Sequence, residues 1–374
     1  MTKVTVLGCG MIGKTIAEEL SYFYEVTCID KNPLQLDKLK SKGKGLKKLL
    51  LELNNKENIL SAIKEADFVV SAVPGFMGFN TLKTIIESGK NVVDISFFAE
   101  DPFELDELAK QKGITAIVDC GISPGFSGII LGHFYKKMKI DSYECLVGGI
   151  PLNPKPPFFY KAPFSPIDVI EEYTRPARII DNGKLVIKEP LTGLEILKFE
   201  PVGYLEAFYT DGLRTLLKTM RINNMMEKTL RYPGHAFFIQ KLKEIGLFDK
   251  QEVLINGTSV IPIEFTSKIL FDHWKLEEGE KECTILRVIL SGESKKIQFD
   301  LYDEYDSETN TTSMARTTGY TCTAALHALV NNLFVRKGIC PPEFLGEDEN
   351  VFNHVVSYLK EKGISIKQSF NSVN

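Results

Sequence analysis

The hydrophobic pattern of residues 1–120 alternates between short apolar runs and amphipathic stretches. In residues 11–20, apolar Ile12, Ile16 and Leu20 share one side of a predicted helix, and charged residues lie opposite them. The apolar runs that predict strands are 3–8, 25–30, 47–53, 67–73, 91–96 and 114–119. Strands that alternate with helices in this way indicate an α/β fold class with a doubly wound parallel sheet.

The pattern changes beyond residue 140, where prolines and aromatic residues are followed by apolar runs with a period of two. This alternation is typical of half-buried strands. The runs are 143–149, 184–188, 195–202, 284–290 and 296–302. They predict a second, mixed α/β domain that contains an antiparallel sheet.

Helical spacing returns at 316–337, with Thr317 or Thr318 as the expected N-cap, and again in the tail at 351–363. We expect these helices to rejoin the first domain. The predicted organisation is therefore a first domain at 1–122, a second domain at 123–315 and returning helices at 316–374. Small substrates usually bind in a cleft between two such domains.

The first strand leads directly into three glycines with the spacing G-x-G-x-x-G. Gly8 suits a tight turn, Gly10 lets the backbone approach a pyrophosphate, and Gly13 lets the next helix pack closely on the strand. The backbone around Met11 and Ile12 then begins a helix, whose N-terminus favours an anion. This arrangement predicts a Rossmann-type domain that binds a dinucleotide.

Asp30 closes the second predicted strand, 17 residues after the last glycine. A carboxylate at that position accepts hydrogen bonds from the ribose hydroxyls of adenosine and repels a 2′-phosphate. We therefore expect NAD as the cofactor. The neighbouring Lys31 leaves NADP possible, because a cation there tolerates a phosphate.

The segments that follow the other strands carry further candidates, since a doubly wound sheet binds its ligand at the carboxyl ends of its strands. The small residues Ala72, Val73 and Pro74 would let the backbone pass close to a nicotinamide. Asp94 and Asp119 end two adjacent strands and are candidates for contact with the substrate. The alternative is that each aspartate caps the helix that follows it.

Two arginines of the second domain lie beside turn residues. Arg214 ends the string TDGLR, and Arg231 lies within TLRYPGH. The planar guanidinium group binds both oxygens of a carboxylate, so we expect an amino acid or keto acid as substrate. The alternative is an internal salt bridge, for example between Arg214 and Glu206 or Asp211.

Composition narrows the possible partners. The net charge of −4 gives no basic field for nucleic acid or an anionic membrane. No apolar run has the length of a membrane span, and the N-terminus shows no secretory pattern. The seven cysteines lack a C-x-x-C pair, which argues against a disulfide framework and a zinc site. We expect a cytoplasmic protein that binds a small molecule and no metal.

Several longer strings resemble the saccharopine dehydrogenase-like family, and most closely its archaeal L-lysine 6-dehydrogenase branch. They are GCGMIG, PGFMGF, DISF, DCGISPG, VGGIP, PKPPFFYK, IEEYTRPAR, TDGLR, TLRYPGH, SMARTTGYT and PPEFLGE. The resemblance implies a Rossmann domain, a second domain like that of glyceraldehyde-3-phosphate dehydrogenase and a returning helix. It also implies action at the ε-nitrogen of lysine or saccharopine with a nicotinamide cofactor, commonly as a homodimer.

One string separates two branches of that family. The saccharopine-reducing branch typically carries GLDPG where this chain has residues 121–125, GISPG. The PKPPFFYK and RYPGH strings favour the lysine-oxidising branch. The expected reaction is therefore oxidative deamination of lysine to 2-aminoadipate 6-semialdehyde, which cyclises to piperideine-6-carboxylate, and ammonia. Saccharopine dehydrogenase is the alternative.

This chemistry requires that the ε-ammonium of lysine loses its proton before the hydride leaves. We expect Asp119 or His235 to transfer the proton, with Tyr160 and Lys161 as further candidates. Asp94 is expected to hold the amine.

Arg231, and then Arg214, are expected to bind the α-carboxylate of the substrate.

Two other functions are compatible with the same residues. A semialdehyde dehydrogenase would use Cys120 as a thiol nucleophile, which requires a lowered pKa. A regulatory protein would bind NAD without turnover.

Overall fold

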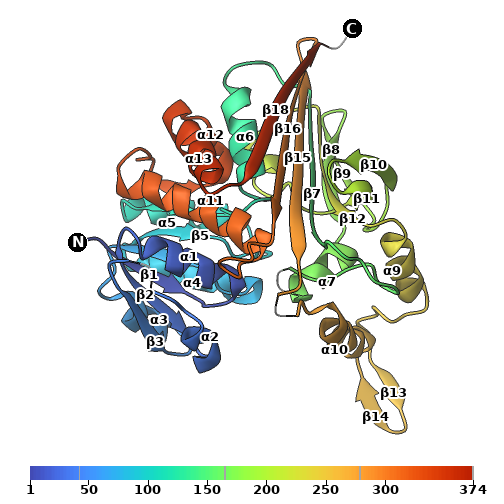
Figure 1. The fold of residues 1–374 in the computed structure, drawn as a ribbon, viewed down its shortest axis with the longest axis horizontal. Coiled ribbons are helices and arrows are strands. Elements are labelled where there is room, and N and C mark those ends of the chain that lie inside the picture. The colour runs from blue at the N-terminus through green and yellow to red at the C-terminus, as the bar shows by residue number, and fades with distance from the viewer. Residues whose placement is uncertain (42, 164–165, 278, 373–374) are drawn as a thin grey trace. The chain divides into compact units, whose positions relative to one another are not determined.

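The computed structural model describes residues 1–41, 43–163, 166–277 and 279–372. The chain divides into two compact units (Figure 1). Unit 1 consists of Met1–Ile140 and Met314–Ile366, and unit 2 consists of Asp141–Ser313 and Lys367–Asn374. Residues 123–140, which the sequence pattern assigns to the second domain, thus lie in unit 1.

Unit 1 is built on a parallel seven-stranded sheet with the order β17-β6-β5-β4-β1-β2-β3. Its strands are β1 (Lys3–Leu7), β2 (Glu25–Asp30), β3 (Leu46–Leu50), β4 (Phe68–Ser71), β5 (Asn91–Asp94), β6 (Thr115–Ile117) and β17 (Gly338–Cys340). β1 pairs with β2 on one side and with β4 on the other. The direction of winding therefore reverses at β1, which is where such sheets bind ligands.

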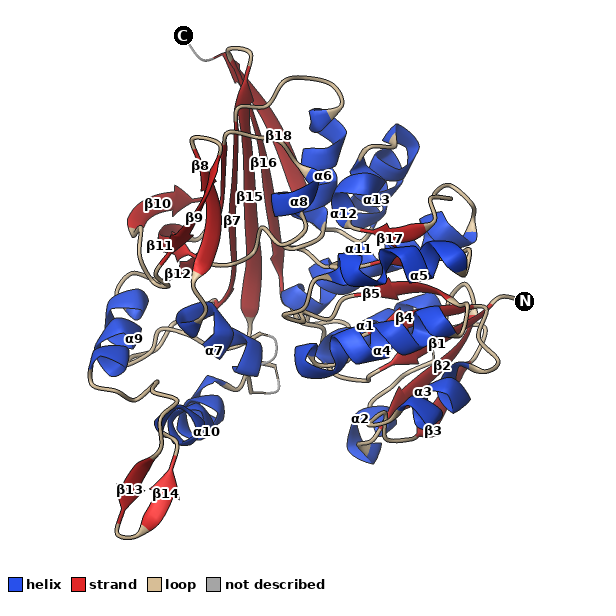
Figure 2. Cartoon of the chain, turned by 180° about the vertical axis from the view of Figure 1, so that it is seen from behind, coloured by secondary structure: helices blue, strands red, loops and turns tan. Residues whose placement is uncertain are grey.

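Helices cover both faces of this sheet (Figure 2). They are α1 (Met11–Leu20), α2 (Pro33–Asp37), α3 (Lys56–Ile63), α4 (Gly75–Glu87), α5 (Asp106–Gln111), α6 (Phe126–Tyr135), α11 (Ser313–Val330), α12 (Pro342–Gly346) and α13 (Glu349–Glu361), with a 3₁₀ turn at Pro102–Leu105. Ile59, Ile85 and Ala109 of α3, α4 and α5 pack in one core cluster. The hydroxyl of Tyr358 on α13 bonds to Glu19 on α1, so the returning helices belong to this unit.

The six strands expected in this region are confirmed to within a few residues. The seventh, β17, is too short to show a pattern in the sequence. The expected N-cap at Thr317 or Thr318 is wrong, because α11 begins at Ser313 and both threonines are buried inside it. The side chain of Glu282 accepts hydrogen bonds from the amide and the hydroxyl of Ser313, which marks the start of this helix.

Unit 2 contains a nine-stranded mixed sheet. Its central path runs β10-β11-β12-β7-β15-β16-β18, and β8 and β9 extend it beside β12. The strands are β7 (Ser142–Pro151), β8 (Ala177–Asp181), β9 (Lys184–Lys188), β10 (Glu195–Phe199), β11 (Gly203–Tyr209), β12 (Asn224–Arg231), β15 (Glu282–Gly292), β16 (Lys295–Glu304) and β18 (Ser365–Ser372). β7 and β12 pair in parallel, whereas the pairs β10–β11, β11–β12, β8–β12, β8–β9, β7–β15 and β15–β16 are antiparallel.

The helices of unit 2 are α7 (Pro166–Thr174), α8 (Leu216–Thr219), α9 (His235–Glu244) and α10 (Pro262–Trp274), and a separate hairpin joins β13 (Val253–Ile255) to β14 (Thr258–Val260). The five expected strands are confirmed. The predicted fold class, a doubly wound parallel domain with a second mixed domain, is confirmed as well.

Residues 123–140 join unit 1 because α6 packs tightly against α12. A Cβ atom at Gly132 would lie 2.0 Å from the carbonyl oxygen of Glu343, and one at Gly346 would lie 2.0 Å from that of Ile129. At the C-terminus, α13 belongs to unit 1, but the following β18 joins the sheet of unit 2. Among the described residues, no helix has the length and apolar character needed to span a membrane.

Candidate functional site

The glycine loop of unit 1 has the geometry that a dinucleotide requires. Gly8 has φ +97°, and a Cβ atom there would lie 2.5 Å from the carbonyl oxygen of Ala72. A Cβ atom on Gly13 would lie 2.1 Å from the carbonyl oxygen of Gly8. Gly10, the N-cap of α1, has no atom within 4 Å of its Cβ position. The loop is thus tightly packed at Gly8 and Gly13 and has free space at Gly10. A pyrophosphate in that space would meet the amides of the first helical turn, including those of Met11 and Ile12.

Asp30 lies against this loop at the end of β2. Its Oδ2 accepts a 2.7 Å hydrogen bond from the amide of Cys9, and its Oδ1 accepts one of 2.8 Å from the amide of Asn32. Each oxygen keeps a further lone pair for a ribose hydroxyl. Lys31 is exposed, and its Nζ lies 3.8 Å from Oε1 of Glu52, which is also solvent-accessible.

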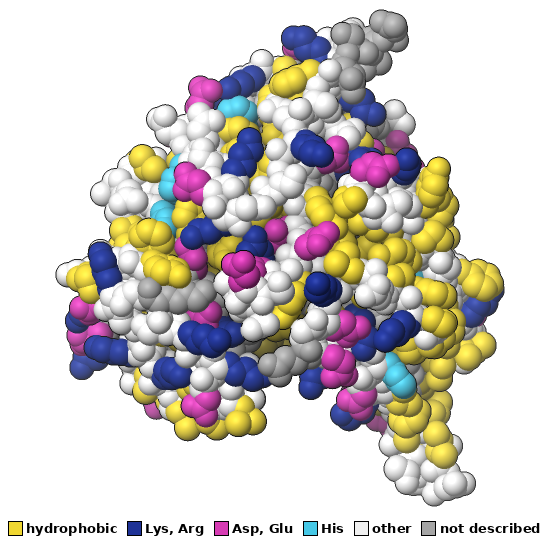
Figure 3. Space-filling model, viewed as in Figure 1, with side chains coloured by type: hydrophobic (Ala, Val, Ile, Leu, Met, Phe, Trp, Pro, Cys, Tyr) yellow, Lys and Arg dark blue, Asp and Glu magenta, His cyan; other side chains and the backbone are white. Residues whose placement is uncertain are grey.

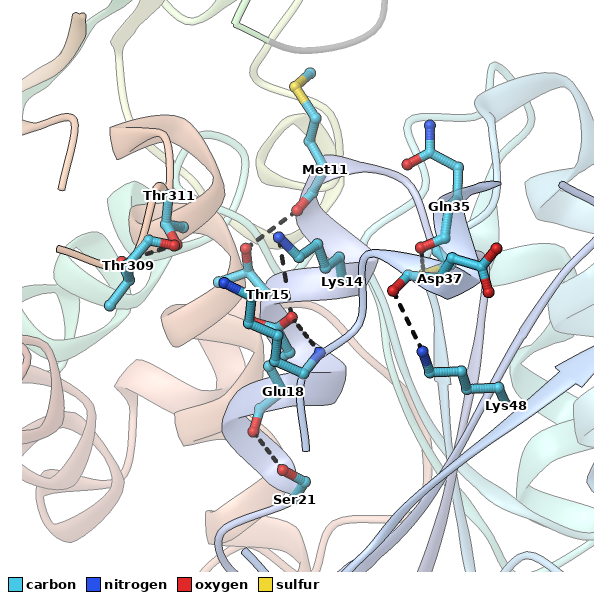
Figure 4. A network of polar contacts seen from close by, with 12 residues as sticks. Met11, Lys14, Thr15, Glu18, Ser21, Gln35, Asp37, Lys48, Thr309 and Thr311 are labelled. Atoms are coloured by element: carbon cyan, nitrogen blue, oxygen red, sulfur yellow. Dashed lines mark hydrogen bonds and ion pairs between the residues drawn. The ribbon is translucent and has the colours of Figure 1, made fainter. Parts of the chain in front are cut away.

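A network of polar contacts holds α1 and α2 in place around the loop (Figure 4). Oε1 of the buried Glu18 accepts a hydrogen bond from the amide of Lys40 and lies 3.9 Å from Nζ of Lys14. The thiol of Cys9 donates to the carbonyl of Gln35. These contacts tie the glycine loop to the segment after β2 and fix the position of the helix N-terminus.

The carboxyl ends of β1, β4, β5 and β6 are joined by backbone hydrogen bonds. The amide of Ala72 donates to Leu7 at 2.9 Å, and that of Ile95 donates to Ser71 at 3.0 Å. The amide of Cys120 donates to the carbonyl of Asp94, also at 3.0 Å. The segments singled out from the sequence, including Val73 and Pro74, thus form one continuous edge of the sheet.

Asp94 and Asp119 lie at this edge and are both buried. The Oδ1 of Asp94 accepts a 2.9 Å bond from the hydroxyl of Ser96, and Oδ2 accepts one of 3.2 Å from the amide of the same residue. Burial raises the pKa of Asp94 to about 7, hydroxyl groups of Ser71 and Ser96 lower it, and the charge of Asp119 raises it further. Asp119 itself has φ +52°, in the left-handed region.

Cys120 is fully buried between these groups. Burial raises the pKa of its thiol far above the ordinary value, and the charges of Asp94 and Asp119 add to this effect. A thiol in this environment stays protonated, so the geometry gives no support to Cys120 as a nucleophile.

In unit 2, Arg231 is the centre of a buried polar cluster rather than a loop residue. It ends β12 with 1% of its surface exposed, so its side chain is buried although turn residues follow it directly. Nη2 lies 2.5 Å from Oε2 of Glu172 and donates to the hydroxyl of Tyr160 at 3.3 Å. Nε donates to the hydroxyl of Tyr173 at 3.3 Å.

His235 belongs to the same cluster. Nδ1 lies 2.8 Å from the carbonyl oxygen of Phe158, which can only accept, so Nδ1 carries the proton and Nε2 accepts from the hydroxyl of Tyr173 at 2.8 Å. Burial lowers the pKa of His235 to about 3, and the charge of Arg231 contributes. The imidazole is therefore neutral at physiological pH and orients Tyr173.

Two buried hydrogen-bond donors of this cluster lack an acceptor among the residues that the structure describes. The indole Nε1 of Trp274 has no partner, although the side chain is fully buried. The hydroxyl of Tyr160 accepts from Arg231, and its own proton has no acceptor in this part of the chain. The two rings lie 5.5 Å apart. A buried donor without a partner costs about 1–3 kcal/mol, so this cluster is suited to a ligand with acceptor atoms.

The TDGLR string lies in a second, separate set of ion pairs. Asp211 holds Arg178 through two bonds of 2.8 Å, to Nε and Nη2. Glu206 accepts from the amides of Gly234 and Ala236 at the start of α9. Neither acid therefore forms the internal pair with Arg214 considered above. Arg214 is buried and has φ +48°.

Three members of the Arg231 cluster were not singled out from the sequence: Glu172, Tyr173 and Trp274. Glu172 and Tyr173 lie within the IEEYTRPAR string, so the family resemblance could have pointed to them as site residues. Trp274 is the one tryptophan of the sequence, and only the fold brings it to the cluster. Lys161, a further candidate, donates instead to the carbonyl of Lys275 at 2.9 Å.

Comparison with known proteins identifies two family domains, whose boundary at residue 117 differs from that between the two units. Residues 4–117 match the saccharopine dehydrogenase NADP binding domain, and residues 117–364 match the saccharopine dehydrogenase C-terminal domain. Saccharopine dehydrogenase [NADP(+), L-glutamate-forming] of Schizosaccharomyces pombe is 25% identical over 314 residues, which cover 78% of this chain and 68% of that protein.

Two further proteins are similar to this chain, one in sequence and one in fold. Mitochondrial alpha-aminoadipic semialdehyde synthase of Mus musculus is 27% identical over 268 residues, 67% of this chain but only 29% of that protein. Apo saccharopine dehydrogenase (L-Glu forming) from Saccharomyces cerevisiae has the same fold, with a TM-score of 0.78, 17% identity and full coverage of both chains. The chain belongs to the saccharopine dehydrogenase family of nicotinamide-dependent oxidoreductases.

Proposed function

We propose that this chain is an NAD-dependent L-lysine 6-dehydrogenase. The proposal rests on the buried cluster around Arg231, where a cation lies beside two hydrogen-bond donors that have no acceptor among the residues that the structure describes. An α-carboxylate supplies acceptor oxygens. The Tyr160 hydroxyl and the Trp274 indole would donate to it, and Arg231 would supply the compensating charge.

The neighbouring Glu172 supports an amino acid over a keto acid. Its side chain is 23% exposed and pairs with Arg231, so a negative and a positive charge lie side by side. An α-amino acid presents both charges together, and a keto acid presents only the negative one. The positive Arg231 and the negative Glu172 together are complementary to the two charges of an α-amino acid.

The residues at the sheet edge of unit 1 support oxidation at a carbon next to nitrogen. The ε-ammonium of lysine must lose a proton before its lone pair can assist hydride loss, because the charged nitrogen cannot form an iminium. Asp119 would accept this proton. Asp94 lies below the surface with its oxygens turned to Ser71 and Ser96, so we assign it a positioning role beside Asp119 rather than a contact with the amine.

A bound nicotinamide would accept the hydride from Cε of lysine. Gly8, Gly10 and Gly13 would shape the loop that receives its pyrophosphate, and Ala72, Val73 and Pro74 would line the passage of the nicotinamide half. Water then adds to the iminium carbon, and ammonia leaves as 2-aminoadipate 6-semialdehyde forms. The semialdehyde cyclises with its own α-amine to piperideine-6-carboxylate.

The preference for NAD rests on Asp30. The matching domain family and the S. pombe relative carry NADP in their names. In this chain a carboxylate lies at the ribose position and both of its oxygens are fixed by backbone amides, so it cannot swing away from a 2′-phosphate. The exposed Lys31 next to it is a cation that could offset this repulsion.

The alternative is oxidation of the secondary amine of saccharopine, which the relatives' names favour. Saccharopine carries three carboxylates, and a second cationic group would be needed for the additional ones. Arg214 is the candidate for that role. The two functions are separated by assaying L-lysine and saccharopine with NAD and with NADP, and by analysing the products. Glutamate formation from saccharopine, with lysine inert, would replace the proposed function by the alternative.

A further inference from the structure

The donors of the Arg231 cluster lie below the protein surface. Hydrophobic side chains gather on the surface of unit 2 over α9 and from α10 onto the hairpin (Figure 3). Five members of the cluster each expose 3% or less of their surface: Tyr160, Tyr173, Arg231, His235 and Trp274. A ligand can reach these groups only if a neighbouring segment moves.

One segment that packs on the cluster has no regular structure. Tyr160 lies between β7 and α7 within residues 153–161, which form neither helix nor strand and which we call the strap. The other four members lie on regular elements: Tyr173 on α7, Arg231 on β12, His235 on α9 and Trp274 on α10. Helical or sheet hydrogen bonds hold those elements, so the strap can move with the least loss of backbone bonds.

The strap has an outer side in solvent and an inner side on the cluster. Residues 155–157 are exposed. The ring of Phe158 lies 6.0 Å from that of Trp274, and the ring of Tyr160 lies 5.1 Å from that of His235. Three of the nine residues of the strap are prolines, whose fixed φ limits the conformations of the backbone. We therefore expect the strap to move as one piece.

Backbone hydrogen bonds anchor the chain at both ends of the strap. Just before it, the amide of Leu152 donates to the carbonyl of Lys281 at 3.0 Å. Just after it, the amide of Ala162 donates to the carbonyl of Trp274 at 2.8 Å, and the side chain of Lys161 adds a bond beside this second anchor. The strap can thus lift from the cluster while both of its ends stay in place.

Two hydrogen bonds hold the middle of the strap, and both lead into the cluster. The carbonyl of Phe158 accepts from Nδ1 of His235 at 2.8 Å, and the hydroxyl of Tyr160 accepts from Nη2 of Arg231 at 3.3 Å. No other hydrogen bond joins residues 153–160 to the rest of the described chain. The closed position of the strap therefore depends on the residues that it covers.

His235 connects the strap to Arg231. Since Nδ1 donates to Phe158, Nε2 keeps the lone pair that accepts from the hydroxyl of Tyr173 at 2.8 Å. That hydroxyl in turn accepts from Nε of Arg231 at 3.3 Å. The three bonds run in one direction, from Arg231 to the carbonyl of the strap. Loss of the imidazole would release both the strap and the hydroxyl that holds Arg231.

We propose that the strap opens to admit the substrate and closes over its carboxylate, and that His235 is the positioning residue that holds the closed strap and Arg231 together. Closing brings the Tyr160 hydroxyl to the carboxylate. The proton of this hydroxyl finds an acceptor only when the ligand is bound, so binding favours the closed strap. This inference rests on the proposed function, because it takes the substrate carboxylate as the ligand of the cluster.

Hydrogen–deuterium exchange of the full chain, read by mass spectrometry on peptides from residues 153–161, measures the opening of the strap. We expect His235→Leu to speed exchange there about tenfold or more without any ligand, because the bond to Phe158 is lost. The control His133→Leu removes a buried imidazole of α6 in unit 1 and should leave this exchange unchanged. Exchange in the wild type should slow about tenfold when the substrate binds.

His235→Asn separates the two bonds of the imidazole. Its amide nitrogen can replace Nδ1 and donate to Phe158, but the side chain is too short to accept from Tyr173. We expect strap exchange within about threefold of the wild type, a KM for the amine substrate raised about tenfold, and kcat changed less than about threefold. The pH profile of kcat should keep its shape, since a positioning residue transfers no proton.

These kinetics use whichever of L-lysine and saccharopine the wild type oxidises, and the exchange of the ligand-free variants needs neither. Failure of lysine as substrate would therefore refute the proposed function without deciding the fate of the strap. Should His235→Leu not fold, Tyr160→Phe removes the other bond of the strap and should speed its exchange about threefold or more. Unchanged exchange in these variants, unchanged exchange on substrate binding, or loss of a limb of the pH profile in His235→Asn would each overturn the inference.

Discussion

The guanidinium carbon of Arg231 lies 4.3 Å from the ring centroid of Tyr160, and Nη2 of the same arginine donates to the hydroxyl of that tyrosine. The arginine is thus held by the ring and by the oxygen of one side chain. In the proposed function, the hydroxyl proton of Tyr160 is donated to the substrate carboxylate.

Replacing Tyr160 by phenylalanine tests this assignment with a small change. Tyr160→Phe removes one donor to the substrate carboxylate and keeps the ring below Arg231. We expect the KM for L-lysine to rise about tenfold, as for loss of one bond to a charged group, with kcat changed less than about threefold. Steady-state kinetics measure both constants. Tyr204→Phe, at an exposed position of β11, is the control. An unchanged KM would remove Tyr160 from the substrate site.

Gly10→Ala separates nucleotide binding from folding. The Cβ position of Gly10 is free of protein atoms, so the variant should unfold at the wild-type temperature. The added methyl group would occupy the space of the pyrophosphate, and we expect affinity for NADH to fall at least about tenfold. Thermal unfolding and fluorescence titration measure the two effects. Full NADH affinity in this variant would place the dinucleotide elsewhere.

Asp30→Asn isolates the charge at the ribose position. The amide oxygen can still accept from the Cys9 backbone, while the repulsion of a 2′-phosphate is lost. We expect the ratio of kcat/KM for NAD over that for NADP to fall about tenfold or more. The matched control Lys31→Ala removes the neighbouring cation and should move the ratio towards NAD. A ratio that is the same in Asp30→Asn and the wild type would contradict the assignment of NAD preference to Asp30.

The raised pKa of Asp94 predicts how the stability of the fold depends on pH. Its pKa is raised to about 7 in the folded protein, so the folded state binds a proton that the unfolded state has already released above pH ~4. The stabilising contribution of the neutral carboxyl is complete below that pH and is lost as the pH rises through about 7. Asp94→Asn should remove this loss and become more stable than the wild type above pH ~7, by an amount on the order of a few kcal/mol.

Unfolding by denaturant at a series of pH values from ~4 to ~8 measures this difference. The control Asp37→Asn alters an exposed carboxylate and should follow the wild type throughout. Parallel pH profiles for Asp94→Asn and the wild type would show that Asp94 titrates at its ordinary pKa.

The cofactor half of the molecule was predictable because its signals are local. β2 was predicted with its observed bounds, since an apolar run ends there in Asp30, and the glycine spacing fixed the start of α1. By contrast, β17 has three residues and joins the sheet from a distant part of the chain, so neither length nor periodicity reveals it.

The second unit was harder to predict because charged residues are buried there. Glu227 and Lys228 interrupt the apolar pattern of β12, yet both are inside, and Lys228 is bonded to Glu195 and to the carbonyl of Gly193. Arg231 is buried in the same way, in a cluster with Glu172. Partners that are 59 residues apart in the sequence leave no periodic trace.

The central claim is that the protein oxidises free L-lysine at its ε-carbon. The most direct measurement follows formation of reduced cofactor from NAD with L-lysine, saccharopine and 6-aminohexanoate, while ammonia and glutamate are quantified. We predict turnover of L-lysine with one ammonia per reduced cofactor, and weak turnover of 6-aminohexanoate because it lacks the α-ammonium that Glu172 would meet. Glutamate release from saccharopine, with L-lysine inert, would contradict the account.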